Sequence, residues 1–139
     1  MLLDDVIINK IESMHRCIVR IKEEYEGFED EFELNYTKQD SVVLNLERAS
    51  QACIDIASHI TRVYKLGVPK STRELFVLLE ENKFISKKSS ENMQKMVGFR
   101  NIAVHDYQNL NLDILVNIIT KNLGDFESFI EDIKGSQVC

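Results

Sequence analysis

The sequence is poor in the residues that interrupt or cross-link a chain. Its 139 residues include one proline, five glycines, three cysteines and no tryptophan. So few prolines and glycines predict few turns and long elements of secondary structure. No apolar run approaches the ~20 residues that a membrane helix needs, which excludes an integral membrane protein. The start, with Asp4 and Asp5, lacks the basic and apolar regions of a secretory signal peptide, so we expect none.

Cysteine usage excludes two further classes of protein. Cys17, Cys53 and Cys139 are odd in number and widely spaced, so they predict neither a disulfide framework nor a CxxC metal pair. The His, Cys and carboxylate residues show no spacing typical of metal ligands, and we expect neither a metal nor a cofactor. Unpaired cysteines favour a reducing compartment, so we expect a cytoplasmic protein.

The pattern that remains is helical. The length and an ordinary composition, with 44% apolar and 29% charged residues, indicate one globular domain over residues 1–139. Apolar residues recur at steps of three and four, and no alternating strand pattern competes. We therefore expect an all-α antiparallel bundle of about five helices, starting near residues 5, 37, 72, 86 and 112.

Local signals predict where these helices begin and end. Thr37 with Asp40, and Ser71 with Glu74, have the spacing of capping boxes at helix starts. The expected helix ends lie near Gly27, Gly67, Tyr107 and Gly135. Gly98 falls inside the fourth helix at a cost of about 1 kcal/mol relative to alanine. That cost suggests the close approach of another helix, such as a partner's.

The end of the fourth helix concentrates polar side chains. Arg100, Asn101, His105, Asp106 and Tyr107 fall within eight positions. On a continuous helix Arg100 and Tyr107 share a face, whereas His105 lies roughly 140° from Arg100. Arg100 and His105 can therefore face one cleft only if the helix end is distorted or a second copy completes the site. Cations at a helix C-terminus and half-buried tyrosines also occur without any catalytic role.

The pattern Arg100-Asn101-x3-His105-Asp106-Tyr107 resembles the Arg-x4-His-x-Tyr signature of HEPN-domain ribonuclease toxins, specifically the HepT family. The resemblance continues in order through residues 46–59, 66–69, 73–76 and 96–101. It implies a HEPN-like helical bundle that forms a homodimer, with the two Arg–His motifs facing each other across the interface. It also implies a toxin of a type VII toxin–antitoxin system in a prokaryotic cytoplasm.

The same resemblance implies a metal-independent endoribonuclease that cuts tRNA or mRNA by attack of the RNA 2′-OH. Arg100 is always charged and matches phosphate oxygens bidentately, and His105, with an ordinary pKa of about 6.5, can act as base or acid. Two facing copies would supply two histidines, one for each role. Asn101 is expected to cap or orient Arg100 and Asp106 to orient or neutralise His105, unless either is a solvated helix-end residue.

The resemblance also implies a regulatory role for Tyr107. In the family, MntA, a minimal nucleotidyltransferase antitoxin, transfers AMP from ATP onto the tyrosine of this motif. Phosphates added beside Arg100 would fill the site and repel RNA. The expected partners are therefore a second copy of the chain, an MntA-like antitoxin and an RNA substrate, with no membrane and no DNA.

The second long helix carries a polar stripe on an otherwise apolar element. Its members step by three and four and are Arg48, Gln51, Asp55, His59 and Arg62. The stripe either lines the RNA cleft or the antitoxin contact, or is a solvated outer face. His15 and His59, taken singly, are expected to be structural.

A rival function belongs to another class. The chain could be a catalytically inactive HEPN module that binds a nucleotidyltransferase or a nucleotide. A plain dimeric scaffold is a third option, but it leaves the clustered motif unexplained. RNA cleavage in EDTA that Arg100→Ala abolishes would favour the enzyme.

The formal net charge of −6 opposes RNA binding at first sight, but it is unevenly distributed. Residues 1–60 carry a net −7 and residues 106–139 a net −4. Residues 61–105, with nine basic and four acidic side chains, carry a net +5 and lead into the motif. This basic segment could form a phosphate-binding patch if the third and fourth helices bring it to one surface.

Overall fold

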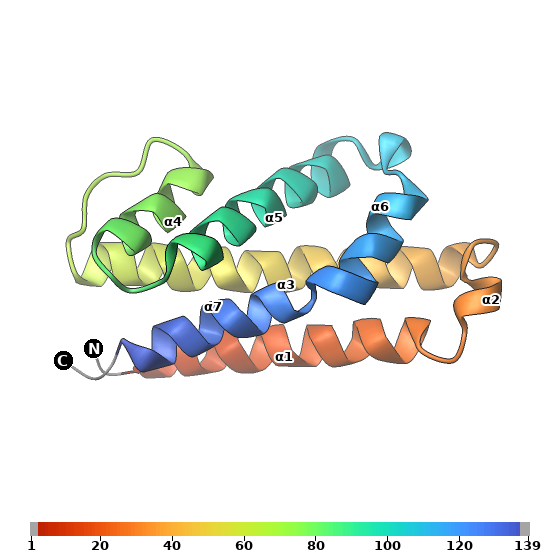
Figure 1. Cartoon of the computed structure of the whole chain (residues 1–139), viewed down its shortest axis with the longest axis horizontal. Coiled ribbons are helices and arrows are strands. Elements are labelled where there is room, and N and C mark those ends of the chain that lie inside the picture. The colour runs from red at the N-terminus through yellow and green to blue at the C-terminus, as the bar shows by residue number, and fades with distance from the viewer. Residues whose placement is uncertain (1–2, 137–139) are drawn as a thin grey trace.

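A computed structural model describes residues 3–136, which form seven α-helices, a short 3-10 helix and a π-helical segment, without a β-strand (Figure 1). The α-helices are α1 (Asp5–Tyr25), α2 (Glu29–Phe32), α3 (Tyr36–Val63), α4 (Thr72–Glu81), α5 (Lys87–His105), α6 (Leu112–Asn117) and α7 (Gly124–Gly135). The 3-10 helix η1 spans Tyr107–Asn109, and the π-helical segment η2 spans Ile118–Asn122. The predicted all-α antiparallel bundle is confirmed. No helix within these residues is long and apolar enough to cross a membrane.

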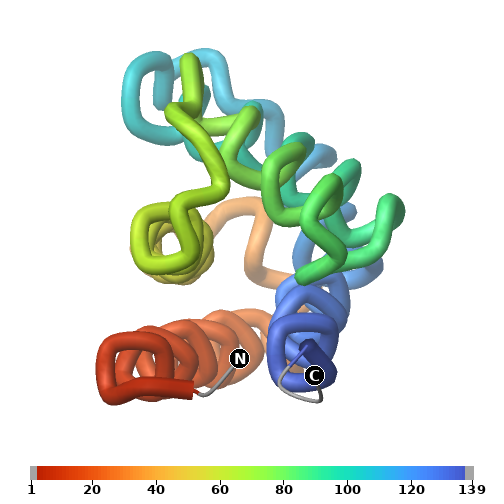
Figure 2. The backbone as a smooth tube through the Cα atoms, turned by 90° about the vertical axis from the view of Figure 1, so that its left-hand side faces the viewer, coloured from red at the N-terminus to blue at the C-terminus, as the bar shows by residue number. Residues whose placement is uncertain are grey.

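The bundle is built around the long antiparallel pair α1 and α3. Helix α7 runs beside α1, antiparallel to it, and the hairpin of α4 and α5 lies over α3 (Figures 1 and 2). Phe76 of α4 and Phe129 of α7 are fully buried and meet edge to face, with ring centroids 5.7 Å apart. Apolar stripes from all the long helices thus close on one core, which holds α5 and its C-terminal motif in place.

Side-chain caps define most helix starts as predicted. Ser71 and Ser86 accept backbone N–H groups at the starts of α4 and α5, with N···O distances of 3.2 Å and 3.1 Å. The start of α3 expected near Thr37 is confirmed to within one residue, but the expected cap at Thr37 is wrong. Asn35 is non-helical and its side chain accepts the N–H of Lys38 at 3.1 Å, so the helix begins one residue after it and includes Thr37.

Two helix ends differ from the expectation, and one expected helix is divided. Helix α3 ends at Val63 rather than near Gly67, because Lys65 adopts a left-handed conformation with φ of 52°. Helix α5 ends at His105 rather than Tyr107, because Asp106 leaves helical geometry. The expected last helix is divided into α6, η2 and α7. Successive four-residue steps from Leu115 to Leu123 drift around an α-helix, and the wider π turn keeps these residues facing the core.

Cys17 and Cys53 are buried free thiols, as their spacing predicts. Burial raises the pKa of each thiol, so both are unreactive at neutral pH. Cys139 lies outside the described residues.

Candidate functional site

The Arg–His motif occupies the last two turns of α5, just before η1. The N–H of Asp106 donates to the carbonyl of Ile102 at 2.8 Å, so the helix stays regular through His105. A regular helix directs Arg100 and His105 about 140° apart. Arg100 and His105 could face one cleft through a distorted helix end or through a second copy of the chain. The distorted helix end is not found.

Arg100 faces inward along the buried stripe of α5. It follows Met93 and Met96 and precedes Ala103 at helical spacing, and all three of these residues are buried. The side chain is half-buried, and its Nε is fully shielded yet has no hydrogen-bond partner. A buried donor without a partner is costly, and a guanidinium presents its donors in a fork that fits a phosphate. Arg100 thus has the environment of an anion-binding group.

His105 is the one histidine of the chain without a partner in residues 3–136. His15 Nε2 lies 3.0 Å from Glu127 Oε2 and joins α1 to α7. His59 Nε2 lies 2.6 Å from Asp4 Oδ2 and joins α3 to α1. These contacts agree with structural roles for His15 and His59. His105 is exposed at the end of α5, where its ring is open to contact with a bound molecule.

Asn101 and Asp106, the two residues expected to support the motif, contact neither Arg100 nor His105 in this structure. Asp106 Oδ1 accepts a hydrogen bond of 2.8 Å from Nδ2 of Asn109, which closes η1. Asn101 is exposed and makes no hydrogen bond within the described part of the chain. Asp106 therefore does not orient His105, and Asn101 does not cap Arg100, in this structure.

Tyr107 lies beyond the helix, so it does not share a helical face with Arg100 as a longer α5 would have required. Its side chain is 44% exposed, and its hydroxyl donates a hydrogen bond to Oδ1 of Asp40 near the start of α3. Partial burial, together with the negative charge and hydrogen bond of Asp40, raises the pKa of Tyr107 to about 12. The phenol is thus held neutral, with one edge open to solvent.

Gly98 is approached by a side chain from another helix of the same chain, α4. A Cβ at this position would lie 2.8 Å from Nη2 of Arg73, which reaches over from α4. Gly98 and His105 are seven residues apart and share a face, so Arg73 lies on the His105 side of α5. Arg73 has no ion pair within residues 3–136. In the sequence, only Gly98 indicated a close approach to this face of α5, and nothing identified Arg73 as the residue that makes it.

Two residues of the polar stripe on α3 contact α1 or its cap, and two more hydrogen-bond to them along α3. Oδ2 of Asp55 lies 2.8 Å from Nζ of Lys10 on α1, and Oδ1 of Asp55 accepts a hydrogen bond of 2.8 Å from Gln51. Nη2 of Arg62 lies 3.4 Å from Nδ1 of His59, which is itself bound to α1. These four residues belong to a polar seam between α1 and α3, so the stripe is not simply a solvated outer face.

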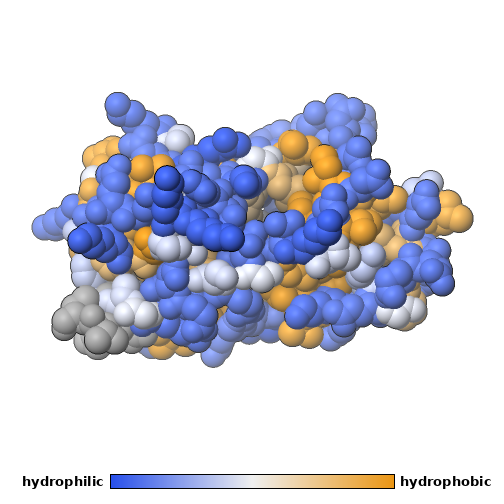
Figure 3. All heavy atoms as spheres, viewed as in Figure 1, coloured by the Kyte–Doolittle hydropathy of each residue, from blue (hydrophilic) through white to orange (hydrophobic). Residues whose placement is uncertain are grey.

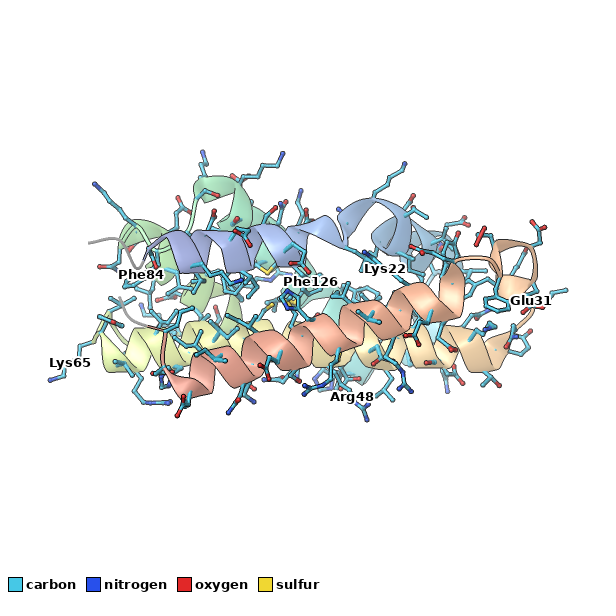
Figure 4. The ribbon with its side chains drawn as sticks, turned by 90° about the horizontal axis from the view of Figure 1, so that it is seen from below. Lys22, Glu31, Arg48, Lys65, Phe84 and Phe126 are labelled. Carbon is cyan, nitrogen blue, oxygen red and sulfur yellow. The ribbon has the colours of Figure 1, made fainter. Side chains whose placement is uncertain are left out.

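Arg48 is the exception within the stripe. It is exposed, has no partner in the described residues, and extends from the outer edge of α3 on the side opposite to Phe126 (Figure 4). Its charge acts on Cys17 together with those of Arg16 and Arg20, so the three arginines lie near one another. Arg48 remains available to a phosphate.

An apolar cavity of about 320 Å³ opens between α5, α6 and α7 and contains none of the motif side chains Arg100, His105 and Tyr107. Apolar atoms gather in the hollow between α5 and α6 (Figure 3). The apolar part of its lining is Leu46, Met93, Met96, Phe99, Ile102, Leu110, Ile114, Ile118 and Phe126. Within the part of the chain described, no three His, Cys, Asp or Glu residues gather where they could hold a metal ion.

Comparison with known proteins decides the family. The family profile described as "Ribonuclease HepT-like" matches residues 14–133. The chain belongs to this HepT-like family. Its similarity to the mRNA nuclease HepT of Shewanella oneidensis is 54% identity over 132 residues, which cover 95% of this chain and 98% of the relative.

Solved structures of HepT-like toxins have the same fold. The tri-AMPylated HEPN toxin of S. oneidensis, in complex with its MNT antitoxin, is 53% identical, with a TM-score of 0.90, over 96% of this chain and 99% of that chain. A toxin–antitoxin structure with AMP-PNP matches at 53% identity and a TM-score of 0.89, over 94% of this chain and 99% of that chain. The HepT-like fold is therefore shared over nearly the full length of both proteins.

Proposed function

We propose that this HepT-like chain is the toxin of a type VII toxin–antitoxin system and acts as an endoribonuclease in a prokaryotic cytoplasm. The observation that carries this proposal is the pair Arg100 and His105, both without partners in residues 3–136, at the end of the helix that bears the family motif. The relative named mRNA nuclease HepT supports RNA as the substrate. Whether tRNA or mRNA is cut depends on surface features outside this motif.

The chemistry needs no metal and no protein nucleophile. One histidine removes the proton of a 2′-OH, whose oxygen attacks the adjacent phosphorus while the bond to the 5′-oxygen breaks. A second histidine donates a proton to that leaving oxygen, which yields a 2′,3′-cyclic phosphate and a free 5′-OH. Arg100 stabilises the negative charge that develops on the phosphate oxygens. Asn101 and Asp106 are adjacent to these residues in the sequence. Alanine substitution of each would test whether it contributes to the reaction.

A homodimer supplies the second histidine. Since α5 is regular, one copy directs Arg100 and His105 away from each other. A cleft completed by the same motif of a second copy resolves this divergence and brings two histidines and two arginines together. Arg48, and with lower priority Gln51, Asp55, His59 and Arg62, remain candidates for a cleft margin or an antitoxin contact.

Control by an MntA-like nucleotidyltransferase antitoxin completes the proposal. The antitoxin transfers AMP to Tyr107, whose hydroxyl edge is partly exposed. A solved relative is tri-AMPylated and bound to an MNT antitoxin, which supports this mode of control. Each added AMP brings a negative phosphate to the motif, where it competes with RNA for the arginines.

Cleavage assays with matched variants test the proposed activity. Purified protein is incubated with total RNA in EDTA and compared with Arg100→Ala, His105→Ala and the exposed control Arg16→Ala. We expect both motif variants to lose cleavage by about 10²-fold or more, while the control keeps it. Equal cleavage by the parent and Arg100→Ala would instead indicate a contaminating nuclease and favour an inactive HEPN module.

A further inference from the structure

The contact between Tyr107 and Asp40 joins two residues that are 67 positions apart in the sequence. Asp40 belongs to the second turn of α3, and Tyr107 begins η1. The family motif contains Tyr107 but not Asp40. Asp40 is exposed and makes no other hydrogen bond or ion pair within residues 3–136. Its carboxylate is therefore free of any cation that would neutralise it and is directed to the phenol alone.

The hydrogen bond also fixes the orientation of the phenol. Because the hydroxyl donates its proton to Oδ1 of Asp40, its lone pairs are directed away from the carboxylate. Tyr107 is 44% exposed, so the residue is open to solvent on one side while its hydroxyl is held by Asp40. A positioned nucleophile whose hydroxyl proton is hydrogen-bonded to a base is the arrangement typical of activated hydroxyl groups in enzymes.

Neutral phenol is the form that must react at physiological pH. The pKa of Tyr107 is raised to about 12, so the phenolate is a negligible fraction of the protein near pH 7. Attack by the oxygen must then be accompanied by transfer of its proton to a nearby acceptor. Asp40 is the acceptor that this chain provides.

We propose that Asp40 positions the Tyr107 hydroxyl for AMP transfer and accepts its proton during the attack. This inference rests on the proposed function of Tyr107 as the AMP acceptor. In the step, the phenolic oxygen forms a bond to the α-phosphorus of ATP, and the bond from that phosphorus to the β-phosphate oxygen breaks. Pyrophosphate leaves with the bonding electron pair, and the phenolic proton passes to Oδ1 of Asp40 and then to solvent.

The modification also removes the contact that promotes it. A tyrosyl phosphodiester has no proton to donate, and its negative charge repels the Asp40 carboxylate. The first AMP therefore releases Tyr107 from α3, and Asp40 acts on the first transfer only. Later AMP units would attach to a nucleotide hydroxyl that Asp40 does not hold.

The experiment measures the initial rate of labelled AMP incorporation from ATP, with the cognate MntA-like antitoxin, into full-length variants. Asp40→Asn keeps an oxygen acceptor of the same shape but is not a base, and Asp40→Glu restores the base. Asp30→Asn, an exposed acidic residue of α2, is the matched control, and thermal unfolding verifies that each variant is folded.

We expect Asp40→Asn to lower kcat for the first AMP by about 10²-fold near neutral pH with little change in KM. Its rate should rise by about tenfold per pH unit between roughly pH 7 and 9, because solvent must now remove the phenolic proton. Asp40→Glu should recover most of the rate, and Asp30→Asn should match the parent.

Two results have distinct meanings. Asp40→Asn with the parental rate and pH profile would overturn the inference and leave Asp40 as a structural tether. Unchanged incorporation into Tyr107→Phe, or none into the parent, would overturn the proposed acceptor role itself.

Discussion

At the scale of single residues, the site is defined by groups that lack partners. Arg100 has a shielded Nε without an acceptor, and His105 makes no hydrogen bond within residues 3–136. The other two histidines are tied to carboxylates of neighbouring helices. A buried donor without an acceptor is uncommon in folded proteins, so this contrast favours Arg100 and His105 over His15 and His59 as residues of the proposed site.

Tyr107 gives a pH prediction at this scale. Since its folded pKa is raised to about 12 from an ordinary value of about 10, the folded state keeps a proton that the unfolded state loses in this window. Stability should therefore be unaffected below about pH 10 and should fall as pH rises toward 12. Tyr107→Phe should lose less stability over this window than the parent, as urea unfolding at several pH values would measure. Parallel losses in both proteins would contradict the raised pKa.

At the scale of elements, α5 combines a favourable start with an interior glycine. Ser86 caps the helix, whereas Gly98 weakens it so that the guanidinium of Arg73 can lie across it. The obstacle to a side chain at this position is the far end of a flexible arginine and not backbone. The close packing at Gly98 thus involves α4 and α5 of one chain.

Gly98→Ala should consequently stabilise the protein by up to about 1 kcal/mol, because helix propensity improves and only the end of Arg73 must move. Chemical denaturation would measure the change in the free energy of unfolding. Gly124→Ala in α7, where a Cβ would meet nothing within 4 Å, is the matched control. A loss of stability confined to Gly98→Ala would mean that Arg73 is held rigidly and cannot give way.

At the scale of the whole molecule, the proposed mechanism with two histidines calls for a dimer, because the regular α5 directs Arg100 and His105 of one copy apart. If two motifs form one site, each heterodimer of parent and His105→Ala subunits holds one histidine in place of two. An excess of His105→Ala subunits, after exchange, should lower the cleavage rate per parental subunit by about tenfold or more. Arg16→Ala subunits should have no such effect. An undiminished rate after verified exchange would show that a single copy is the active unit.

The fold also shows where the basic residues of this acidic chain lie. The basic residues 61–105 form α4, α5 and their connections, which lie together over α3 (Figure 2). Arg73 of α4 lies over Gly98 of α5, Arg100 belongs to α5 itself, and neither has an ion-pair partner in the described residues. A chain with a net charge of −6 therefore carries unpaired cations on and beside the helix that bears the motif.

Much of the fold could be predicted from sequence because helix formation is local. Apolar steps of three and four predicted the long helices, and Ser71 and Ser86 mark their starts correctly. The errors fall where competing local signals are close in strength. Asn35 prevailed over Thr37 as a cap, and the apolar stripe after Leu112 needed a π turn that no sequence pattern indicated.

By itself, the sequence determined the helical class and the family motif, and it placed the proposed site residues Arg100, His105 and Tyr107 within that motif. Only the tertiary structure decided that α5 stays regular through His105, that Asp40 holds Tyr107, and that Asp55 and the rest of its stripe bind mainly within a seam with α1. The physical reason is the distance along the sequence over which each kind of interaction acts. Periodicity and caps act over a few residues, whereas these contacts join side chains that become neighbours only after the helices have packed.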